Sequence, residues 1–525
     1  MVATLDQAVT LHRAGRTAEA AQCYEEVVAA EPEALPARHG FAVLLLQLGK
    51  TDKAREHLEF IIERGGADAN VLNALGVAHQ QNGDTVMAAS SFEQALTYDP
   101  SHGKALANLG VARYQLDDFD GSFESLSRAI QIEPENADSF YSLGQTLRAS
   151  EKLEEAEQAT RRAIQFAPNH VAAHVDLGAT LLALGHTKEA EAQYERALVI
   201  DPDSMEAHHY LAHIKLQQGR LTDGWVDFEW RWRTPDFMAA DSFFNFPAWN
   251  ENPLSEGALL VWAEQGVGDQ IMYASMLPDL KNVQSEVVLA CAPTLVPLFS
   301  RSFPTATVVS MAAAMEDSRL SDTVSAQIPI GSVGRIFRSE MTSFTKRPSF
   351  LVADQNRTAE LQAKYKRLGE DKPLVGVSWR SGNAKTGKAQ SLKLADLAAG
   401  LREKDAAFID LQYGDTSADR AEASRVGLNV IEDTDIDPLT DLDGFAAQVA
   451  ALDLVITISN TTAHVAGALG VPCWVLIPSG LGENWYWFLD RDDSPWYPSV
   501  RLFRQSEPGV WTDVINNVGA AFVSR

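Results

Sequence analysis

Residues 454–470, LVITISNTTAHVAGALG, decide the fold of the second half of this 525-residue chain. A short apolar run ends abruptly at four small polar residues, and an Ala- and Gly-rich stretch with His464 near its start follows. This order predicts a buried strand over 452–458 and then a helix, whose free N–H groups and dipole favour an anion. Helix capping alone, with His464 as a core histidine, is the alternative. The four polar residues are Ser459, Asn460, Thr461 and Thr462.

Apolar runs of similar length recur on both sides of this stretch, separated by helix-like or turn-rich segments. Three of them lie within 258–353 and five within 372–525, with the helix-like segment 354–371 between the two sets. Strands that alternate with helices predict parallel sheets covered on both faces. Two such sets predict two doubly wound lobes, with a ligand in the crevice at the C-terminal ends of their strands.

The segment EQGVGDQ, residues 264–270, follows the first predicted strand of the first lobe. Gly266 and Gly268 allow the backbone to approach a ligand closely, and the following helix directs its amides toward the crevice. Asp269 and Glu264 place two carboxylates at this strand end, where either can act as a general base. A helix cap is the alternative role for Asp269, and the two roles are compatible.

A basic loop follows the first predicted strand of the second lobe. Within a chain of formal net charge −27, residues 380–388 contain three cations, Arg380, Lys385 and Lys388. Arginine can bind a phosphate through two parallel hydrogen bonds, and lysine binds it as a point charge. The loop therefore indicates an anion site, with an exposed basic loop as the alternative.

The first 233 residues contain a repeat with a period of 34 residues. Small residues allow the two helices of a hairpin to approach, and proline after the second helix ends it. The pattern resembles the tetratricopeptide repeat, with six units and a partial seventh, and predicts a solenoid that binds extended peptide. A solenoid that only dimerises the protein or keeps it rigid is the alternative. The repeated positions include Pro100, Pro134, Pro168 and Pro202; Gly76, Gly110, Gly144 and Gly178; and a turn at Gly15, Gly49, Gly83, Asp117, Glu151, Gly185 and Gly219.

Composition excludes several classes of function. The net charge of −27 argues against nucleic acid or an anionic membrane as the main partner. Three widely spaced cysteines fit a reducing compartment, no apolar stretch reaches the length of a membrane span, and no cluster of metal ligands is evident. These features predict a cytoplasmic protein without metal or cofactor. All eleven tryptophans follow residue 224, which places the end of the repeats near 233 and a linker over 234–257.

The second half resembles a known enzyme class. VGVSWR (375–380), DLVITISNTTAHVAGALGVPCWVLIP (453–478) and SPWYPSVRLFRQ (494–505) resemble the nucleotide-binding half of heptosyltransferase-like GT-B glycosyltransferases, and EQGVGDQ resembles the start of their acceptor half. Repeats followed by this module, with EWRW at the join, resemble bacterial protein glycosyltransferases. Among these, the flagellin glycosyltransferases that transfer nonulosonic acids such as pseudaminic acid are the most similar.

This resemblance implies an all-α solenoid over 1–233, a linker, a GT-B acceptor lobe over 258–353, a connecting helix over 354–371 and a nucleotide-sugar lobe over 372–525. It implies O-glycosylation of Ser or Thr on a protein acceptor from an activated nucleotide sugar without a metal, and the acceptor in that family is flagellin. Asp269 or Glu264 is the expected base. The expected nucleotide-sugar-binding residues are Gly266, Gly268, Gln270, Trp379, Arg380, Ser381, Gly382, Lys385, Gln412, Tyr413, Ser459, Asn460, Thr461, Thr462, His464 and Asn484.

One departure from the family pattern bears on the donor. Heptosyltransferase-like enzymes usually carry Asp five positions before the motif histidine, where this chain has Ser459. This change disfavours ADP-heptose, and a CMP-activated nonulosonic acid with its single phosphate fits at least as well. The alternatives are hexose transfer to protein, as in O-GlcNAc transferases, transfer to a lipid, and a non-catalytic adaptor or export chaperone. The asparagine ladder of O-GlcNAc transferases is missing, because Asn73 is followed at the repeat period by Ala107, Tyr141 and Val175.

Overall fold

The computed structural model describes residues 3–233, 244–283, 286–316, 320–383, 386–480 and 482–523. The chain divides into two compact units, one of Met1–Leu184 with Val199–Pro202 and one of Gly185–Leu198 with Asp203–Arg525. The predicted end of the repeats at 233 is where a short 3-10 helix, η1 (Glu229–Arg233), ends. The predicted linker falls partly outside the described residues, since 234–243 are not among them.

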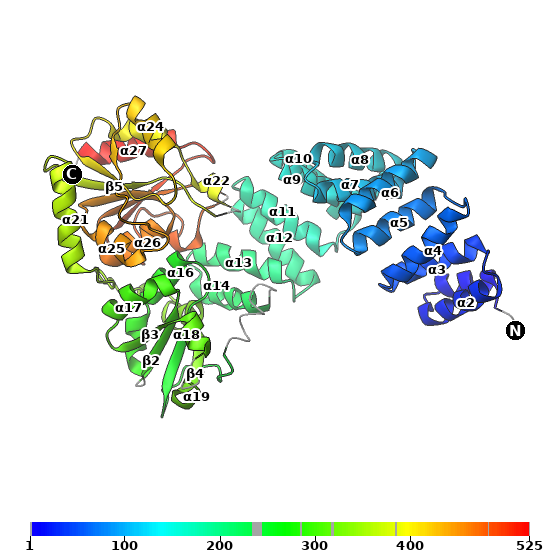
Figure 1. Cartoon of the computed structure of the whole chain (residues 1–525), viewed down its shortest axis with the longest axis horizontal. Coiled ribbons are helices and arrows are strands. Elements are labelled where there is room, and N and C mark those ends of the chain that lie inside the picture. Colours follow the sequence, from blue (N-terminus) through cyan, green and yellow to red (C-terminus); the bar gives the residue numbers. More distant parts are fainter. Residues whose placement is uncertain are drawn as a thin grey trace. The chain divides into compact units, whose positions relative to one another are not determined.

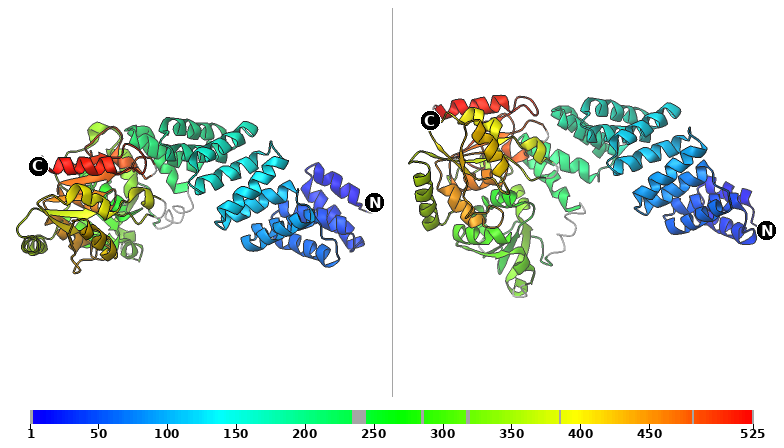
Figure 2. Two further views of the ribbon diagram at one scale, coloured as in Figure 1. Left: turned by 90° about the horizontal axis from the view of Figure 1, so that it is seen from above. Right: turned by 45° about the horizontal axis from the view of Figure 1, so that its top comes forward.

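The N-terminal half consists of antiparallel helical hairpins, as predicted (Figure 1). From residue 69 onward, the first helices of successive hairpins begin 34 residues apart, which confirms the repeat period. Within the first unit, successive hairpins stack side by side (Figure 2). The helices are α1 (Leu5–Arg13), α2 (Thr17–Ala30), α3 (Leu35–Gln47), α4 (Thr51–Glu63), α5 (Ala69–Gln81), α6 (Thr85–Tyr98), α7 (Gly103–Gln115), α8 (Phe119–Ile132), α9 (Ala137–Ala149), α10 (Leu153–Phe166), α11 (Val171–Ala183), α12 (Thr187–Ile200), α13 (Met205–Gln217) and α14 (Leu221–Phe228).

The repeated small and turn residues have the mechanical roles that their spacing predicts. A Cβ atom on Gly76 would lie 2.4 Å from the ring of Phe92, so glycine is needed where these two helices meet. Every residue of the turn position has a positive φ, including the two that are not glycine, Asp117 (60°) and Glu151 (59°). Because the left-handed region disfavours side chains with a Cβ, the glycines at this turn are a backbone requirement.

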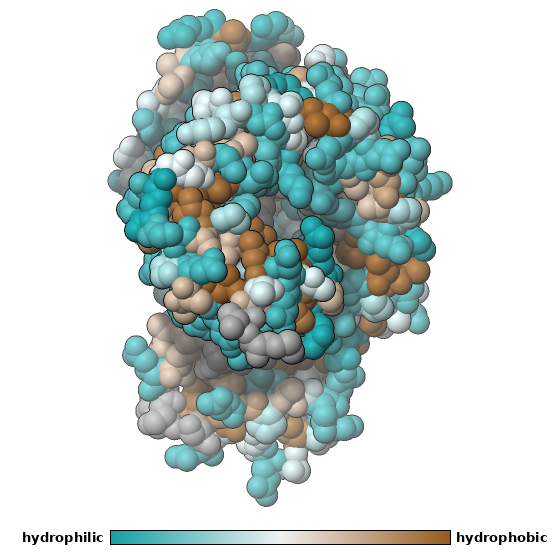
Figure 3. All heavy atoms as spheres, turned by 90° about the vertical axis from the view of Figure 1, so that its right-hand side faces the viewer, coloured by the Kyte–Doolittle hydropathy of each residue, from teal (hydrophilic) through white to brown (hydrophobic). Residues whose placement is uncertain are grey.

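The surface of the repeats is mostly hydrophilic. Seen from the N-terminal side, hydrophilic residues cover most of the visible face and apolar residues form separate patches (Figure 3). The exposed apolar side chains of this region include Val86, with 64% of its surface accessible, and Tyr98, with 59%. This surface is consistent with the strongly negative net charge of the chain.

The first α/β lobe contains a four-stranded parallel sheet with strand order β3-β2-β1-β4. Its strands are β1 (Ala258–Trp262), β2 (Val287–Cys291), β3 (Ala306–Ser310) and β4 (Val324–Pro329). The central strand β1 is buried along its whole length, as its continuous apolar run predicts. The helices of this lobe include α16 (Val267–Ala274), α17 (Val296–Ser302), α18 (Met311–Glu316), α19 (Leu320–Thr323) and α20 (Val333–Phe337).

The second lobe contains a six-stranded parallel sheet with strand order β10-β9-β8-β5-β6-β7, and α21 (Gln355–Leu368) connects it to the first lobe. Its strands are β5 (Leu374–Ser378), β6 (Ala407–Asp410), β7 (Val430–Ile431), β8 (Leu454–Ile458), β9 (Cys473–Ile477) and β10 (Val500–Arg504). Its helices are α22 (Gly387–Gln390), α23 (Leu394–Leu401), α24 (Ser417–Arg425), α25 (Leu442–Ala450), α26 (Thr461–Leu469) and α27 (Thr512–Val523).

Two edge strands, β4 and β10, were not predicted as part of the two sets of apolar runs. Each lies at the end of its sheet, where one side of the strand has no neighbouring strand. Edge strands carry more polar residues than central ones, and Arg501 and Arg504 interrupt the apolar pattern of β10. All eight predicted runs are confirmed as strands, including β3 and β7 at the other edges of the two sheets.

Both sheets reverse their strand order at one point, which creates a crevice. In the first lobe the reversal lies between β1 and β4, and in the second between β5 and β8. At such a point the chain leaves two adjacent strands toward opposite faces of the sheet, and the loops that follow the strands separate. The segments that begin at Ala263, Trp379 and Ser459 therefore border the crevices.

The last helical hairpin packs against both lobes within the second unit. The buried Trp225 of α14 donates from its indole nitrogen to the backbone oxygen of Arg338, at 2.9 Å. Its ring also contacts Gly334 of α20 and lies edge-on to Trp485 in the second lobe, with centroids 5.4 Å apart. The aromatic residues that end the repeats therefore join them to the α/β region, as their composition predicts.

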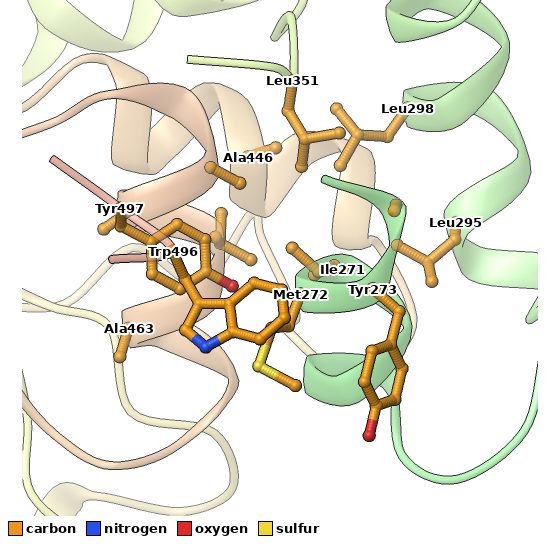
Figure 4. Packing of buried hydrophobic residues seen from close by; sticks show 14 of the residues in the cluster. Ile271, Met272, Tyr273, Leu295, Leu298, Leu351, Ala446, Ala463, Trp496 and Tyr497 are labelled. Carbon is orange, nitrogen blue, oxygen red and sulfur yellow. The ribbon is translucent and has the colours of Figure 1, made fainter. Parts of the chain in front are cut away.

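The two lobes share one hydrophobic core. Ile271 and Met272 of α16 lie beside Trp496 and Tyr497 of the second lobe (Figure 4). Helix α16 packs on α26, so the helices that follow β1 and β8 meet directly. This contact brings the two predicted ligand-binding segments, 264–270 and 459–464, together.

Candidate functional site

A cavity of about 800 Å³ lies between the two lobes. Its volume is within the range of small-molecule sites. The first lobe contributes 265–269 and Thr294, and the second contributes residues that follow β5, β6, β8 and β9. The sequence-predicted residues that line it are Gly266, Gly268, Asp269, Ser381, Gly382, Tyr413, Ser459, Asn460, Thr461, Thr462, His464 and Asn484.

Asn460 caps the N-terminus of α26 at the cavity wall. Its Oδ1 accepts hydrogen bonds from the backbone N–H of Thr462 and the hydroxyl of Thr457, both at 3.0 Å. Its Nδ2 donates to Ser378 Oγ at 2.8 Å, which ties the end of β8 to the end of β5. The capping role is therefore real, and it fixes a helix N-terminus, including Thr461, at the cavity.

Ser459, next to Asn460, joins a second segment to the start of α26. Its hydroxyl oxygen accepts hydrogen bonds from Asn484 Nδ2 and Trp487 Nε1, both at 2.7 Å. These bonds hold the segment after β9 against the start of α26 and fix the side chain of Asn484 where it lines the cavity. A carboxylate at position 459 would accept the same bonds but would add a negative charge beside the helix N-terminus.

His464 is buried beside the cavity and is uncharged. Its Nδ1 lies 2.8 Å from the hydroxyl of Tyr497, and its ring stacks on Trp487 with centroids 5.6 Å apart. Burial lowers the pKa of His464 to about 3, so the imidazole is neutral at physiological pH. A Cβ on Gly268 would lie 2.9 Å from the His464 ring, which shows that this glycine permits the approach of α16 to α26.

Asp269 lies at the start of α16 and lines the cavity. Its Oδ2 accepts a hydrogen bond from the backbone N–H of Gly266 at 3.2 Å, so it also helps to cap the helix. Burial raises the pKa of Asp269 to about 6, and the nearby charge of Glu264 acts in the same direction. A carboxyl group with a pKa near neutrality is suited to general base catalysis.

Glu264 has a structural role instead of the predicted catalytic one. Its two carboxylate oxygens pair with Arg231 at 2.6 and 2.7 Å, and Oε1 also accepts the backbone N–H of Gly331 at 3.0 Å. Both side chains of the pair are buried, with exposed fractions of 4% and 2%. Glu264 does not line the cavity, and its paired oxygens leave Asp269 as the candidate base.

The predicted cations are not among the described residues that line the cavity. Arg380 donates from Nη2 to the backbone oxygen of Asp415 at 3.0 Å, and its Nη1 lies 3.3 Å from Asp419 Oδ2. Its guanidinium is therefore directed toward α24, and the polar side chains that follow it, including Ser381 and Asn383, line the cavity instead. Lys385 lies outside the described residues.

Three further predicted binding residues lie outside the cavity lining and contact the segments that form it. Gln412 Oε1 accepts hydrogen bonds from the hydroxyl of Ser378 and the backbone N–H groups of Trp379 and Arg380, which shapes the loop after β5. The ring of Trp379 is fully buried in the core of the second lobe. Gln270 Oε1 accepts the backbone N–H of Ala292 at 3.0 Å. The sequence predicts that each of these three side chains contacts the nucleotide. In the structure none of them lines the cavity.

Several lining residues were not predicted. His209 and His213 of α13, in the last helical hairpin, line the cavity with their neighbour Phe228 of α14. A pair of histidines four residues apart just before the tryptophan-rich join is a signal that could have been noticed. Others are Gln265, Thr294, Gln390, Pro438, Leu439, Phe445 and Tyr486.

The described residues show neither a metal-binding cluster nor a membrane-spanning helix. Among them, no set of three or more His, Cys, Asp or Glu side chains could hold a metal ion. Within the same part of the chain, no helix has the length and apolar character needed to cross a membrane.

Comparisons with known proteins identify the N-terminal region. Two tetratricopeptide repeat models match this chain, one over residues 11–77 and 147–212 and the other over 73–137. The helical hairpins are tetratricopeptide repeats. Similar solved structures include a tetratricopeptide repeat protein from Parabacteroides merdae, which is 14% identical with a TM-score of 0.37 and covers 46% of this chain and 92% of that one. MamA from Desulfovibrio magneticus is 20% identical with a TM-score of 0.31, over 33% and 97% of the two chains.

One curated relative extends beyond the repeats. Protein FlbA of Caulobacter vibrioides is 33% identical over 326 residues, which cover 59% of this chain and 54% of FlbA. The chain therefore spans about half the length of this relative. Because 59% of the chain exceeds the share of residues in the tetratricopeptide repeats, the match also includes part of the α/β region.

Proposed function

We propose that this protein transfers a sugar from a nucleotide sugar, a CMP-activated nonulosonic acid, to a Ser or Thr hydroxyl of a protein bound by its tetratricopeptide repeats. The observation that carries the proposal is the position of Asp269, whose carboxyl group shares one cavity with the N-terminus of α26. A proton acceptor and an anion-binding helix end are the two groups that glycosyl transfer from a phosphate leaving group requires.

The proposed reaction is a direct displacement at the anomeric carbon. Asp269 accepts the proton of the acceptor hydroxyl as its oxygen forms a bond to this carbon, and the bond from the carbon to the phosphate oxygen breaks. The leaving phosphate gains negative charge, which the backbone N–H groups at the start of α26 and the hydroxyls of Thr461 and Thr462 stabilise. The buried His464 adds a neutral hydrogen-bonding group beside them.

The charges of the cavity support a donor with one phosphate. The lining residues within the described part of the chain include neither Lys nor Arg. A diphosphate leaving group carries more negative charge than a nucleoside monophosphate and requires more cations or a metal to balance it. A CMP-linked sugar fits the described residues better for this reason.

The acceptor proposal rests on the repeats. Tetratricopeptide repeats present a continuous surface on which extended segments of other proteins bind. The resemblance to flagellin glycosyltransferases makes flagellin the proposed acceptor. The test is the intact mass of flagellin co-expressed with this protein in cells that make the CMP-nonulosonate. A gain of one or more sugar masses supports the proposal, and unmodified flagellin that still binds the repeats would support an adaptor instead.

We expect the transfer rate to depend on pH through Asp269. Its pKa is raised to about 6, so the carboxyl group gains a proton, and stops acting as a base, as the pH falls through this value. Below it, kcat/KM should fall about tenfold for each pH unit. Initial rates between pH 5 and pH 8 measure this dependence. A flat profile down to pH 5 would contradict the assignment.

Replacement of Arg380 with methionine should leave the affinity for CMP within about threefold of wild type, because its guanidinium is directed away from the cavity. Replacement of Thr461 with valine should weaken CMP binding about tenfold or more, because a hydrogen bond to the charged phosphate is lost. Calorimetric titration of both variants with CMP measures the difference. If R380M weakened CMP binding more than T461V, Arg380 would be a phosphate-binding residue.

A further inference from the structure

A small cavity, separate from the one that Asp269 lines, lies where the two lobes meet. Its volume is about 10 Å³, which is large enough for one water-sized particle. The first lobe contributes Ser275, directly after α16, and Arg338, directly after α20. The segment that leads to α21 contributes Arg347 and its neighbours, and the second lobe contributes Trp496, which lies beside α16 (Figure 4).

Three buried polar atoms of the residues that line this cavity have no hydrogen-bond partner within the described part of the chain. They are Arg338 Nε, Ser275 Oγ and Trp496 Nε1. Their residues are 3%, 6% and 4% exposed, so bulk solvent does not satisfy them. Both nitrogens can only donate, and the serine hydroxyl can donate as well. Because buried polar groups in proteins are almost always hydrogen-bonded, the three donors indicate an acceptor in this cavity.

The charged groups at this cavity have an excess of positive charge. Arg338 and Arg347 share one carboxylate, that of Asp279, and each pairs with a different oxygen of it. The other residues of the lining are uncharged. Burial lowers the pKa of Arg338 and Arg347 acts in the same direction, while the bond to Asp279 opposes them. Since arginine stays protonated in proteins, a second negative charge would be stabilised here.

We propose that this cavity binds a chloride ion. The ion accepts hydrogen bonds from Arg338 Nε, Trp496 Nε1 and the hydroxyl of Ser275, and it balances the charge of the second arginine. A water molecule is neutral and would leave that charge unbalanced. Because the donors come from both lobes, the bound ion stabilises the contact between them. The inference does not rest on the proposed transfer reaction, whose groups line the other cavity.

Bromide tests the site directly, because it can replace chloride and scatters X-rays anomalously. Crystals of the full-length protein soaked in sodium bromide should show an anomalous peak in contact with Arg338 Nε and Trp496 Nε1. Density for a water molecule without anomalous signal, or a cavity without a peak, would overturn the proposal.

Thermal unfolding of the full-length protein tests the site in solution. Chloride replaces gluconate, an anion too large for this cavity, at constant ionic strength. A ligand that binds only the folded protein raises its Tm, and we expect a rise of about 2–4 °C that saturates with chloride concentration. A Tm that stays constant, or that rises without saturation, would show that the ion binds only at crystal concentrations and would also overturn the proposal.

Two variants remove single donors. Ser275→Ala should raise the chloride concentration that gives half of the Tm increase about tenfold, because a hydrogen bond to a charged ligand is lost. Trp496→Phe should do the same. Its Tm without chloride should also fall, because Trp496 packs in the core that the lobes share, so the dependence on chloride is the quantity to compare.

Ser494→Ala is the matched control. The hydroxyl of Ser494 is also buried and also has no partner among the described residues, but Ser494 does not line the cavity. Its replacement should leave the dependence on chloride as in wild type. If S275A and W496F kept the wild-type dependence, or if S494A lost it to the same extent, the assignment of this cavity to chloride would be wrong.

Discussion

Replacement of Asp269 with asparagine is expected to lower kcat by about a hundred- to ten-thousand-fold, the usual contribution of a general base. Asparagine has the same shape and can still accept the backbone hydrogen bond from Gly266, so the start of α16 should keep its structure. It cannot accept the proton of the acceptor hydroxyl. Steady-state rates with purified acceptor and donor measure the loss, and CMP affinity should stay within about threefold of wild type.

A matched control comes from the same lobe. Asp322 of α19 is an exposed carboxylate that does not line the cavity, and its replacement with asparagine should leave kcat unchanged. A D269N variant that kept more than about a third of the wild-type rate would show a decrease too small for the loss of a general base. Asp269 would then be a structural cap, and another group would be the base.

Replacement of Arg231 with methionine is expected to lower the free energy of unfolding of the second unit by about 3–5 kcal/mol. The substitution leaves the carboxylate of Glu264 buried without its cation, although the backbone N–H of Gly331 remains as a partner. All eleven tryptophans follow residue 224, so tryptophan fluorescence during urea unfolding reports on this region.

Two further variants isolate the cause of that loss. Arg233→Met removes an exposed pair with Asp203, whose side chains are 59% and 79% accessible, and should cost less than about 1 kcal/mol. The double variant R231M/E264L removes both buried charges and should recover most of the stability lost in R231M. If R231M and R233M lowered the free energy of unfolding equally, the buried pair would not be what stabilises the contact between the first lobe and the last repeat.

The turns between the repeat helices and the buried strands are the parts of the fold that the sequence predicted best, because backbone geometry and burial restrict the residues at these positions. The turn between repeat helices requires a left-handed residue, and this requirement recurs every 34 residues as glycine or as Asp117 and Glu151. Eight strands were predicted from short apolar runs, which are continuous in the inner strands because both of their faces are buried. Strands β4 and β10 were missed because polar residues interrupt their apolar runs.

The sequence predicted the site residues that lie directly after strands. It did not predict side-chain contacts between residues far apart in the chain. Segments after a strand reach the same edge of a sheet, so Gly268, Asp269 and Thr461 were correctly brought together at one cavity. Glu264 pairs with Arg231, which is 33 residues away in sequence, and Arg380 pairs with Asp419. No local pattern identifies such partners, and none places a repeat helix with His213 at the cavity between the two lobes.

The most direct test of the account is a crystal structure of the full-length protein with CMP. We expect the phosphate to lie at the N-terminus of α26, within hydrogen-bond distance of the Thr461 and Thr462 groups, with Asp269 across the cavity from it. A phosphate bound elsewhere, or well-ordered crystals at saturating CMP that show no nucleotide in this cavity, would contradict it.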